Sequence, residues 1–119
     1  MKGDDPNAIR VVLVTHRDAD EAKALATQLV TERLAACVNV VPGVTSVYRW
    51  QGAIREDAEA LMVIKTAEHR IGPLKHRIAK LHPYENPEIL ILPTDGGSRK
   101  YLDWVVAETA PHGREDAPH

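Results

Sequence analysis

The chain is poor in cysteine and in aromatic residues, and each shortage excludes a class of protein. One cysteine in 119 residues cannot form an intramolecular disulfide, which excludes a secreted scaffold held together by disulfides. Phenylalanine is absent and aromatic residues make up 4% of the chain, so we do not expect recognition of nucleic acid by base stacking. A net charge of −2 gives no electrostatic basis for binding nucleic acid or an anionic membrane.

Long apolar runs are also missing. No segment approaches the roughly 20 apolar residues that cross a bilayer. No apolar run precedes Ile9, so we expect no signal peptide and a cytoplasmic location. The remaining composition, 44% hydrophobic and 27% charged, is typical of a globular protein. We expect a flexible lead-in over residues 1–8, one domain over residues 9–109 and a disordered tail over residues 110–119.

The apolar patterning predicts four strands and three helices. Runs rich in β-branched residues predict strands over residues 9–15, 37–50, 58–66 and 89–92, with a break at Pro42 and Gly43 in the second. Residues 51–57 are expected to connect the two middle strands as a hairpin. Helical periodicity, with candidate caps at Asp18 and Ser98, predicts helices over residues 19–34, 69–81 and from residue 99.

The order β-α-β-β-α-β-α predicts an α+β, ferredoxin-like fold with an extra C-terminal helix. That fold places both main helices on one face of the sheet. The first, third and fourth strands nevertheless carry apolar residues on both faces. An exposed apolar sheet face of this size normally meets a partner. We therefore infer a homo-oligomer whose subunits bury these faces against each other.

Residues 82–89 (HPYENPEI) concentrate polar side chains on a connection stiffened by two prolines. The imidazole of His82 and the carboxylate of Glu85 are both metal-ligand types, and a turn can converge them on one ion. The alternative is that His82 caps the preceding helix at the negative end of its dipole. Cys37 is either a soft ligand for Cu(I) or Zn, or a small core residue.

Other residues are weaker candidates for a functional site. His16 ends the first strand, where folds of this class often place ligands. The remaining histidines lie on one helix (His69 and His76) or in the expected tail (His112 and His119). A further set of residues is expected to line a pocket or a subunit contact: Tyr48, Trp50, Lys65, Tyr84 and Glu88. Lys65 lies in an apolar strand, so we expect a structural ion pair with a partner such as Glu88.

No catalytic signature is present. The sequence has no GxSxG, phosphate loop, GxGxxG or HExxH. His82 and Glu85 have the residue types of a general acid–base pair, but the sequence indicates no nucleophile or substrate to accompany them. We do not expect an enzyme.

Five sequence blocks together resemble the CutA family of divalent-cation tolerance proteins. They are LAACVN at 34–39, SVYRWQG at 46–52, KT at 65–66, HPYENPEI at 82–89 and YLDW at 101–104. Asn86 departs from the family, which usually has an apolar residue such as valine there. The resemblance implies a homotrimer of ferredoxin-like subunits similar to PII-type proteins. It also implies tolerance of copper and other divalent cations, with Cu(II) or another divalent cation held by Cys37, His82 and Glu85.

Three functions follow for comparison. The first is a non-enzymatic trimer that binds a divalent cation near the turn containing His82 and Glu85. The second is a PII-like sensor with a small-ligand pocket between subunits, lined by the set of Tyr48, Trp50, Lys65, Tyr84 and Glu88. The third is a structural scaffold with no physiological metal. In each, the expected partner is a second copy of the chain, and neither nucleic acid nor a membrane is expected.

Overall fold

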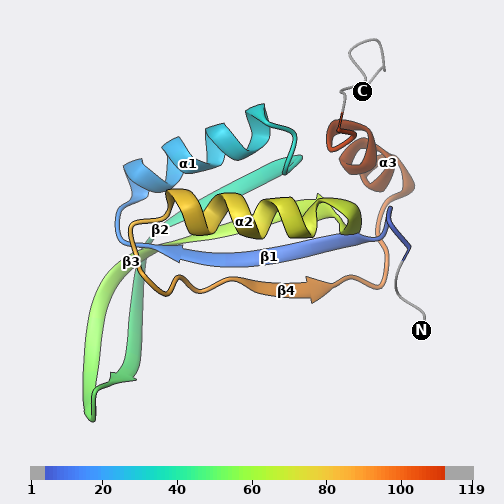
Figure 1. The fold of residues 1–119 in the computed structure, drawn as a ribbon. Coiled ribbons are helices and arrows are strands. Elements are labelled where there is room, and N and C mark those ends of the chain that lie inside the picture. Colours follow the sequence, from blue (N-terminus) through green and yellow to red (C-terminus); the bar gives the residue numbers. More distant parts are fainter. Residues whose placement is uncertain (1–4, 112–119) are drawn as a thin grey trace.

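A four-stranded antiparallel sheet organises the fold, and the computed structural model describes residues 5–111 around it (Figure 1). The elements follow in the order β1 (Ile9–His16), α1 (Ala19–Thr31), β2 (Cys37–Trp50), β3 (Ala53–Ala67), the short 3-10 helix η1 (Glu68–Arg70), α2 (Ile71–Leu81), β4 (Leu90–Pro93) and α3 (Arg99–Glu108). The strand order in the sheet is β2-β3-β1-β4. The predicted α+β, ferredoxin-like fold is confirmed.

The ends of the domain are partly described. Residues 1–4 of the expected lead-in and 112–119 of the expected tail, with His112 and His119, lie outside the described residues. Within the lead-in, the carbonyls of Pro6 and Ala8 accept hydrogen bonds from the backbone N–H groups of His69 and Glu68. Among residues 5–111, no helix has the length and apolar character needed to cross a membrane.

The predicted helix starts agree with the observed caps. Asp18 accepts a hydrogen bond from the Glu21 N–H at 2.9 Å and begins α1. Ser98 accepts one from the Tyr101 N–H at 3.4 Å and begins α3. Each cap satisfies a backbone donor that the first helical turn leaves without a partner.

The main core lies between the sheet and two helices. Figure 1 shows α1 and α2 side by side on one face, with α3 at one end of the sheet. Alternate residues of the two central strands face these helices and are fully buried. The core residues are Val12 and Val14 of β1, Met62 and Ile64 of β3, Leu25 and Leu29 of α1, and Leu74 and Ile78 of α2.

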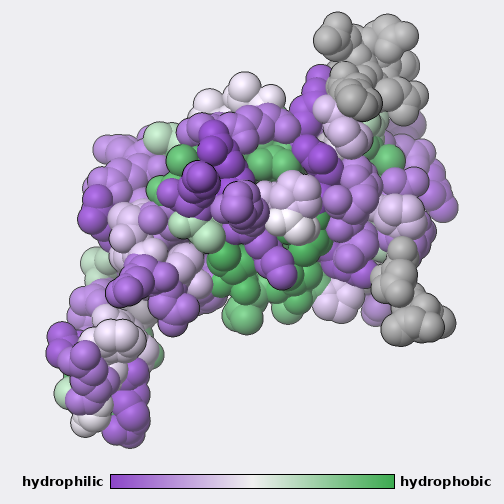
Figure 2. All heavy atoms as spheres, in the orientation of Figure 1, coloured by the Kyte–Doolittle hydropathy of each residue, from purple (hydrophilic) through white to green (hydrophobic). Residues whose placement is uncertain are grey.

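The opposite sheet face is also apolar, as the sequence predicts. Val11 pairs with Leu92 and Leu13 pairs with Leu90 across β1 and β4. No described helix covers these pairs as α1 and α2 cover the core face, and Leu90 and Leu92 remain 53% and 43% exposed. Figure 2 shows green apolar side chains gathered at the lower middle of the molecule, where β4 runs in Figure 1. We call this surface the open face.

β2 and β3 extend beyond the helices as a bent two-stranded arm (Figure 1). The predicted break at Pro42 and Gly43 is a shift in strand register between Val41 and Val44, and Gly43 adopts φ 73°. This bulge bends the arm away from the body. Residues 44–58 of the arm contribute no side chain to the buried core.

The hairpin connection is shorter than the sequence predicts. The return strand begins at Ala53 rather than at residue 58, and Gln51 and Gly52 alone form the turn. Both have positive φ, 51° and 82°, as a two-residue type I′ hairpin requires. The charged run of residues 55–57 looks like a loop in sequence. It forms a strand because both faces of the arm are exposed and need no apolar side chains.

Replacement of Leu74 by alanine tests the main core. Leu74→Ala is expected to lower the free energy of unfolding by about 2–5 kcal/mol, because it leaves a cavity in a fully buried site. Leu81→Ala, on the same helix but 38% exposed, is the matched control and should cost less than about 1 kcal/mol. Urea unfolding at one fixed protein concentration measures both. Equal losses would contradict the placement of the core.

Candidate functional site

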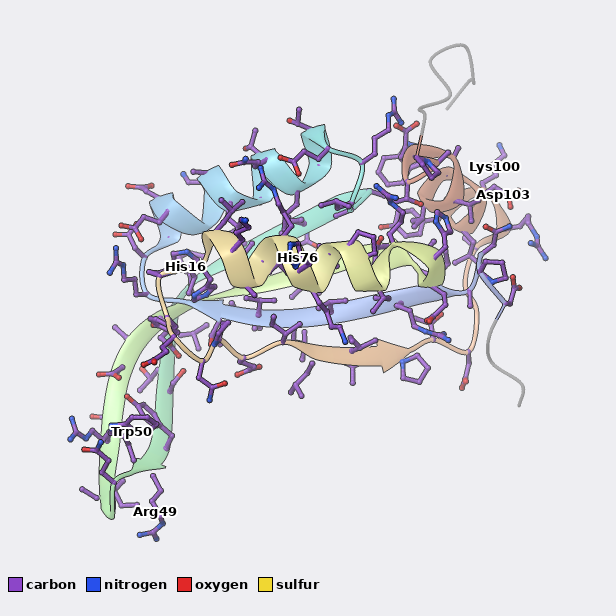
Figure 3. The ribbon with its side chains drawn as sticks, in the orientation of Figure 1. His16, Arg49, Trp50, His76, Lys100 and Asp103 are labelled. Carbon is purple, nitrogen blue, oxygen red and sulfur yellow. The ribbon has the colours of Figure 1, made fainter. Side chains whose placement is uncertain are left out.

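A cleft of about 800 Å³ opens between the arm and the turn of residues 82–89. Its volume lies within the range of ordinary small-ligand sites. Figure 3 shows Trp50 far along the arm and His16 at the end of β1 near the base of the arm. The cleft is lined by Thr15, Ser46, Val47, Tyr48, Trp50, Arg55, Asp57, Glu59, Tyr84, Glu85, Asn86 and Glu88.

Strand alternation builds the arm wall of the cleft. Ser46, Tyr48 and Trp50 are two residues apart, so they share one face of β2, as the sequence predicts. The register places Asp57 opposite Ser46 and Arg55 opposite Tyr48 on that same face. The Tyr48 hydroxyl donates a hydrogen bond to the Asp57 carboxylate, which raises the pKa of Tyr48. The phenol and the carboxylate therefore fix each other across the two strands.

His82 holds the turn against the sheet. Its Nε2 lies 2.8 Å from the carbonyl oxygen of Thr15, which can only accept, so Nε2 donates. Its Nδ1 accepts a hydrogen bond from the Tyr84 N–H at 3.1 Å. The ring is therefore the neutral Nε2–H tautomer, and neither nitrogen has a free lone pair.

The helix-capping alternative for His82 holds for its backbone only. The His82 N–H donates to the Ile78 carbonyl at 2.8 Å and ends α2. The imidazole does not cap the helix; it turns toward β1 instead. The His82 side chain is buried, although sequence reasoning treats it as a surface ligand or cap.

Tyr84 connects the turn to the arm. Its hydroxyl donates to Glu59 Oε2 at 2.6 Å, and its ring lies 4.7 Å from the His82 ring between centroids. Burial, together with the bond to Glu59, raises the pKa of Tyr84. The phenol therefore stays protonated at neutral pH and keeps donating. A continuous path of contacts runs from Thr15 through His82 and Tyr84 to Glu59.

His16 forms a buried histidine pair with His82. The two ring centroids are 4.6 Å apart, and His16 is only 2% exposed. Its Nδ1 accepts a hydrogen bond from the Asp18 N–H at 3.4 Å, at the start of α1. Burial lowers the pKa of His16, and the neighbouring His82 lowers it further. His16 thus belongs to the structural support of the turn.

Negative charge dominates the cleft. Four carboxylates line it, from Asp57, Glu59, Glu85 and Glu88, against the single guanidinium of Arg55. Asp57 and Glu59 each accept a bond from a phenol. Within the described chain, Glu85 and Glu88 have no hydrogen bond or ion pair. The electrostatic field of this arrangement favours a cationic ligand.

The structure brings part of the predicted site together. Tyr48, Trp50, Tyr84 and Glu88 all line the cleft, and Lys65 does not. The Lys65 ammonium instead bonds to Asn39 and lies 3.9 Å from the Cys37 sulfur. The ion pair expected between Lys65 and Glu88 is therefore replaced by a contact with β2.

The predicted metal ligands do not converge within one subunit. Cys37 is level with Val11 in the sheet, through Lys65, whereas His82 contacts Thr15, four residues further along β1. Four residues of strand separate the two levels by about 13 Å. Among residues 5–111, no three His, Cys, Asp or Glu side chains are placed to hold one ion. Metal binding by Cys37, His82 and Glu85 stays a prediction.

Sequence reasoning missed several residues of the cleft. Thr15, Arg55, Asp57 and Glu59 were not singled out, although all line it. For Arg55 and Asp57 the signal is the hairpin register, because residues opposite Tyr48 and Ser46 must share their face. Glu59 lies opposite Val44 in the same register, whereas Thr15 belongs to β1 and lies outside the hairpin. That register depends on the length of the turn, which the sequence suggests incorrectly.

A family profile, relatives in sequence and solved structures all match this chain to the same protein family. A family profile described as "CutA1 divalent ion tolerance protein" matches residues 10–108. The divalent-cation tolerance protein CutA of Thermus thermophilus is 52% identical over 99 residues, covering 83% of this chain and 96% of that protein. The solved structure of the Thermus thermophilus protein has a TM-score of 0.83 at 51% identity, covering 86% of this chain and 99% of that one.

More distant relatives agree over the same region. CutA1 of Oryza sativa has a TM-score of 0.84 at 43% identity, covering 87% of this chain and 94% of that structure. Protein CutA of Homo sapiens is 42% identical over 100 residues, which are 84% of this chain and 56% of the human protein. The chain therefore spans about half the length of its plant and mammalian relatives, for which the covered share is 54–56% in Arabidopsis, rice, mouse and human.

The buried His16 predicts a loss of stability in acid. Its pKa is lowered in the folded state, so the unfolded chain binds the proton more readily once the pH falls below about 6.5. Stability should decline from there until the pH passes below the folded pKa. His16→Asn keeps an acceptor for the Asp18 N–H but cannot titrate, so its unfolding midpoint should change less between pH 7.5 and pH 5.

The matched control is His76→Asn, at an exposed position of α2. It should retain the pH dependence of the unaltered chain in the same urea unfolding series. Identical pH dependence in the His16 variant and the unaltered chain would contradict the assignment.

Proposed function

Because the chain belongs to the CutA1 divalent ion tolerance protein family, we propose that it contributes to tolerance of divalent cations by binding them, without catalysing a reaction. The observation that carries this proposal is the surplus of carboxylates around the cleft, four against one guanidinium. Glu85 and Glu88 are the candidate ligands because they have no other bond within the described chain.

We propose that His82 positions the turn that presents Glu85, rather than acting as the first contact of the ion. Both of its ring nitrogens are engaged by Thr15 and Tyr84. The same engagement argues against catalysis, because a general acid or base needs a nitrogen that is free to exchange a proton. A direct contact between His82 and a metal would require the loss of one of these two bonds.

Copper is the narrower proposal. Imidazole and thiolate ligands favour copper, whereas carboxylates favour harder ions such as Mn²⁺. One subunit offers carboxylates in the cleft, with Cys37 elsewhere. We therefore propose that a copper site is completed by groups from a neighbouring subunit. A cytoplasmic location remains part of the same proposal.

A homotrimer is the proposed assembly. Its support is the open face, where leucines of β4 stay exposed beside apolar residues of β1. In addition, β2 and β4 are both edge strands of the sheet. Exposed edges and apolar faces are usually covered in stable proteins. A closed ring of identical subunits covers both without leaving new edges.

A second candidate is a PII-like sensor of a small ligand. The observation that favours it is the size of the cleft, about 800 Å³, together with three aromatic side chains in its lining. A single metal ion does not need such a volume. The aromatic residues are the ones the sequence assigns to a pocket, namely Tyr48, Trp50 and Tyr84.

Glu85→Gln tests the metal proposal. It removes a charge from the cleft with little change in shape, so the affinity for Cu(II) and Mn(II) should fall about tenfold or more. His82→Asn should also weaken binding, by about tenfold, as loss of a supporting residue around a metal ligand typically does. Calorimetric titration at neutral pH gives both affinities. His112 and His119 are replaced by alanine throughout, because histidines outside the cleft also bind copper.

The matched control is Glu56→Gln, since Glu56 neighbours Asp57 on β3 and therefore points to the opposite face of the arm. Its affinity should remain that of the parent. If Glu85→Gln and Glu56→Gln bind copper and manganese equally well, the cleft is not the metal site.

The assembly is tested separately by light scattering on a sizing column. The unaltered chain should elute as a trimer, and Leu92→Glu should dissociate it by placing a charge on the open face. Leu81→Glu places the same charge at a leucine on α2, outside that face, and should remain trimeric. Circular dichroism confirms that each variant folds. A monodisperse monomer for the unaltered chain would refute the trimer.

A further inference from the structure

We propose that the arm side of the cleft binds an organic cation, specifically an aliphatic diamine or polyamine. This inference rests on the small-ligand candidate above and does not depend on metal binding. It combines three observations: the cleft carries an excess of carboxylates, aromatic side chains stand among them, and hydrogen bonds fix both in place.

The aromatic side chains supply surfaces for an alkylammonium chain. Tyr48 and Trp50 lie two residues apart on one face of β2, and Tyr84 faces them from the turn. An ammonium group over an aromatic ring is attracted by the negative charge of the ring face, most strongly for tryptophan. The methylene groups between two ammonium groups gain by leaving water against the same rings. Inorganic cations gain nothing from the second effect.

The carboxylates are spaced for more than one charge. Asp57 and Glu59 are two residues apart on β3, so their backbones lie about 7 Å apart on the same face. That distance is close to the span between the two ammonium groups of diaminobutane. Glu85 and Glu88 extend the row from the turn. A linear polycation can therefore meet successive carboxylates along the cleft.

The same spacing is unsuited to one metal ion. An ion needs several ligand atoms within about 2–2.6 Å, and no such group of side chains exists among residues 5–111. A flexible amine does not require convergence at a point. Dispersed carboxylates thus favour a long organic cation over a compact one, within a single subunit.

The cleft is also organised before a ligand arrives. Tyr48 and Tyr84 each donate to a carboxylate, Asp57 and Glu59 respectively. Each carboxylate keeps most of its acceptor sites, because one bond uses only one of about four lone pairs. Side chains already held in place lose less entropy when a ligand binds. Arg55, opposite Tyr48, is the one cation in the lining and leaves the cleft with net negative charge.

Tryptophan fluorescence tests the proposal directly, because the chain has only Trp50 and Trp104. Trp104→Phe leaves Trp50 as the single reporter in the full chain. Titration with spermidine and with diaminobutane at pH 7 and low salt should give a saturable change in its emission, in the millimolar range or below. Trp50→Phe, with Trp104 as the reporter, should show no change in emission. Its calorimetric affinity should fall by less than that of Trp50→Leu, because phenylalanine keeps an aromatic face that attracts a cation less strongly than tryptophan does.

Two variants should weaken binding measured by calorimetry. Trp50→Leu removes the aromatic face and should reduce the affinity for spermidine about fivefold or more. Asp57→Asn removes a charged acceptor and should reduce it about tenfold. Glu56→Gln, on the opposite face of the arm, is the matched control and should bind as the parent does. Calorimetry on the unaltered chain gives the same readout if Trp104→Phe fails to fold.

Ligand controls separate amine recognition from general attraction of cations. Butanediol has the same carbon chain as diaminobutane without its charges, and magnesium chloride supplies charge without a carbon chain; neither should reproduce the response. The proposal is overturned if spermidine gives no saturable binding, if magnesium at equal ionic strength reproduces it, or if Trp50→Leu and Asp57→Asn leave its affinity unchanged. Because copper and manganese titrations are scored separately at Glu85, loss of amine binding leaves the metal proposal standing.

Discussion

The constraint on which this molecule depends is a sheet that is apolar on both faces but carries its two main helices on only one of them. Val12 and Val14 are buried beneath α1 and α2. Their neighbours Val11 and Leu13 lie on the opposite face of the sheet, beside the exposed leucines of β4. The free energy of burying the first face folds the subunit. The second face remains available for association. In the proposed homotrimer, folding and assembly use opposite sides of the same strands.

Much of this arrangement could be predicted from the sequence. The unbroken apolar runs of β1 and β3 indicate strands that are covered on both sides, and Asp18 and Ser98 mark the starts of helices. The strands of the arm are harder to predict from sequence, because residues 55–57 are charged and the arm buries almost nothing within the subunit. Apolar alternation, the main strand signal, is absent where both faces are exposed. The sequence pattern consequently predicts a start of β3 at residue 58, whereas the strand begins at Ala53.

Some residues of the cleft can likewise be predicted from the sequence and others cannot. The aromatic residues of the cleft were recognised, because tyrosine and tryptophan are rare in this chain and stand out. Their carboxylate partners do not stand out, because acidic residues are common. Only the strand register places Asp57 diagonally across from Tyr48, where the two side chains form a hydrogen bond. The role of His82 was also beyond sequence reasoning. Its ring bonds to Thr15, 67 residues away along the chain, and long-range contacts of this kind leave no local pattern.

The bulge at Pro42 and Gly43 has a consequence for how such a protein can change over time. In the part of β2 and β3 that belongs to the body of the subunit, each substitution affects the packing of the buried core. Beyond the bulge, residues 44–58 lie outside that core, so substitutions there are largely released from the demands of folding. The SVYRWQG block at 46–52 that this chain shares with its family lies in this arm, so what limits change there is the ligand or partner that the arm meets rather than the packing of the subunit.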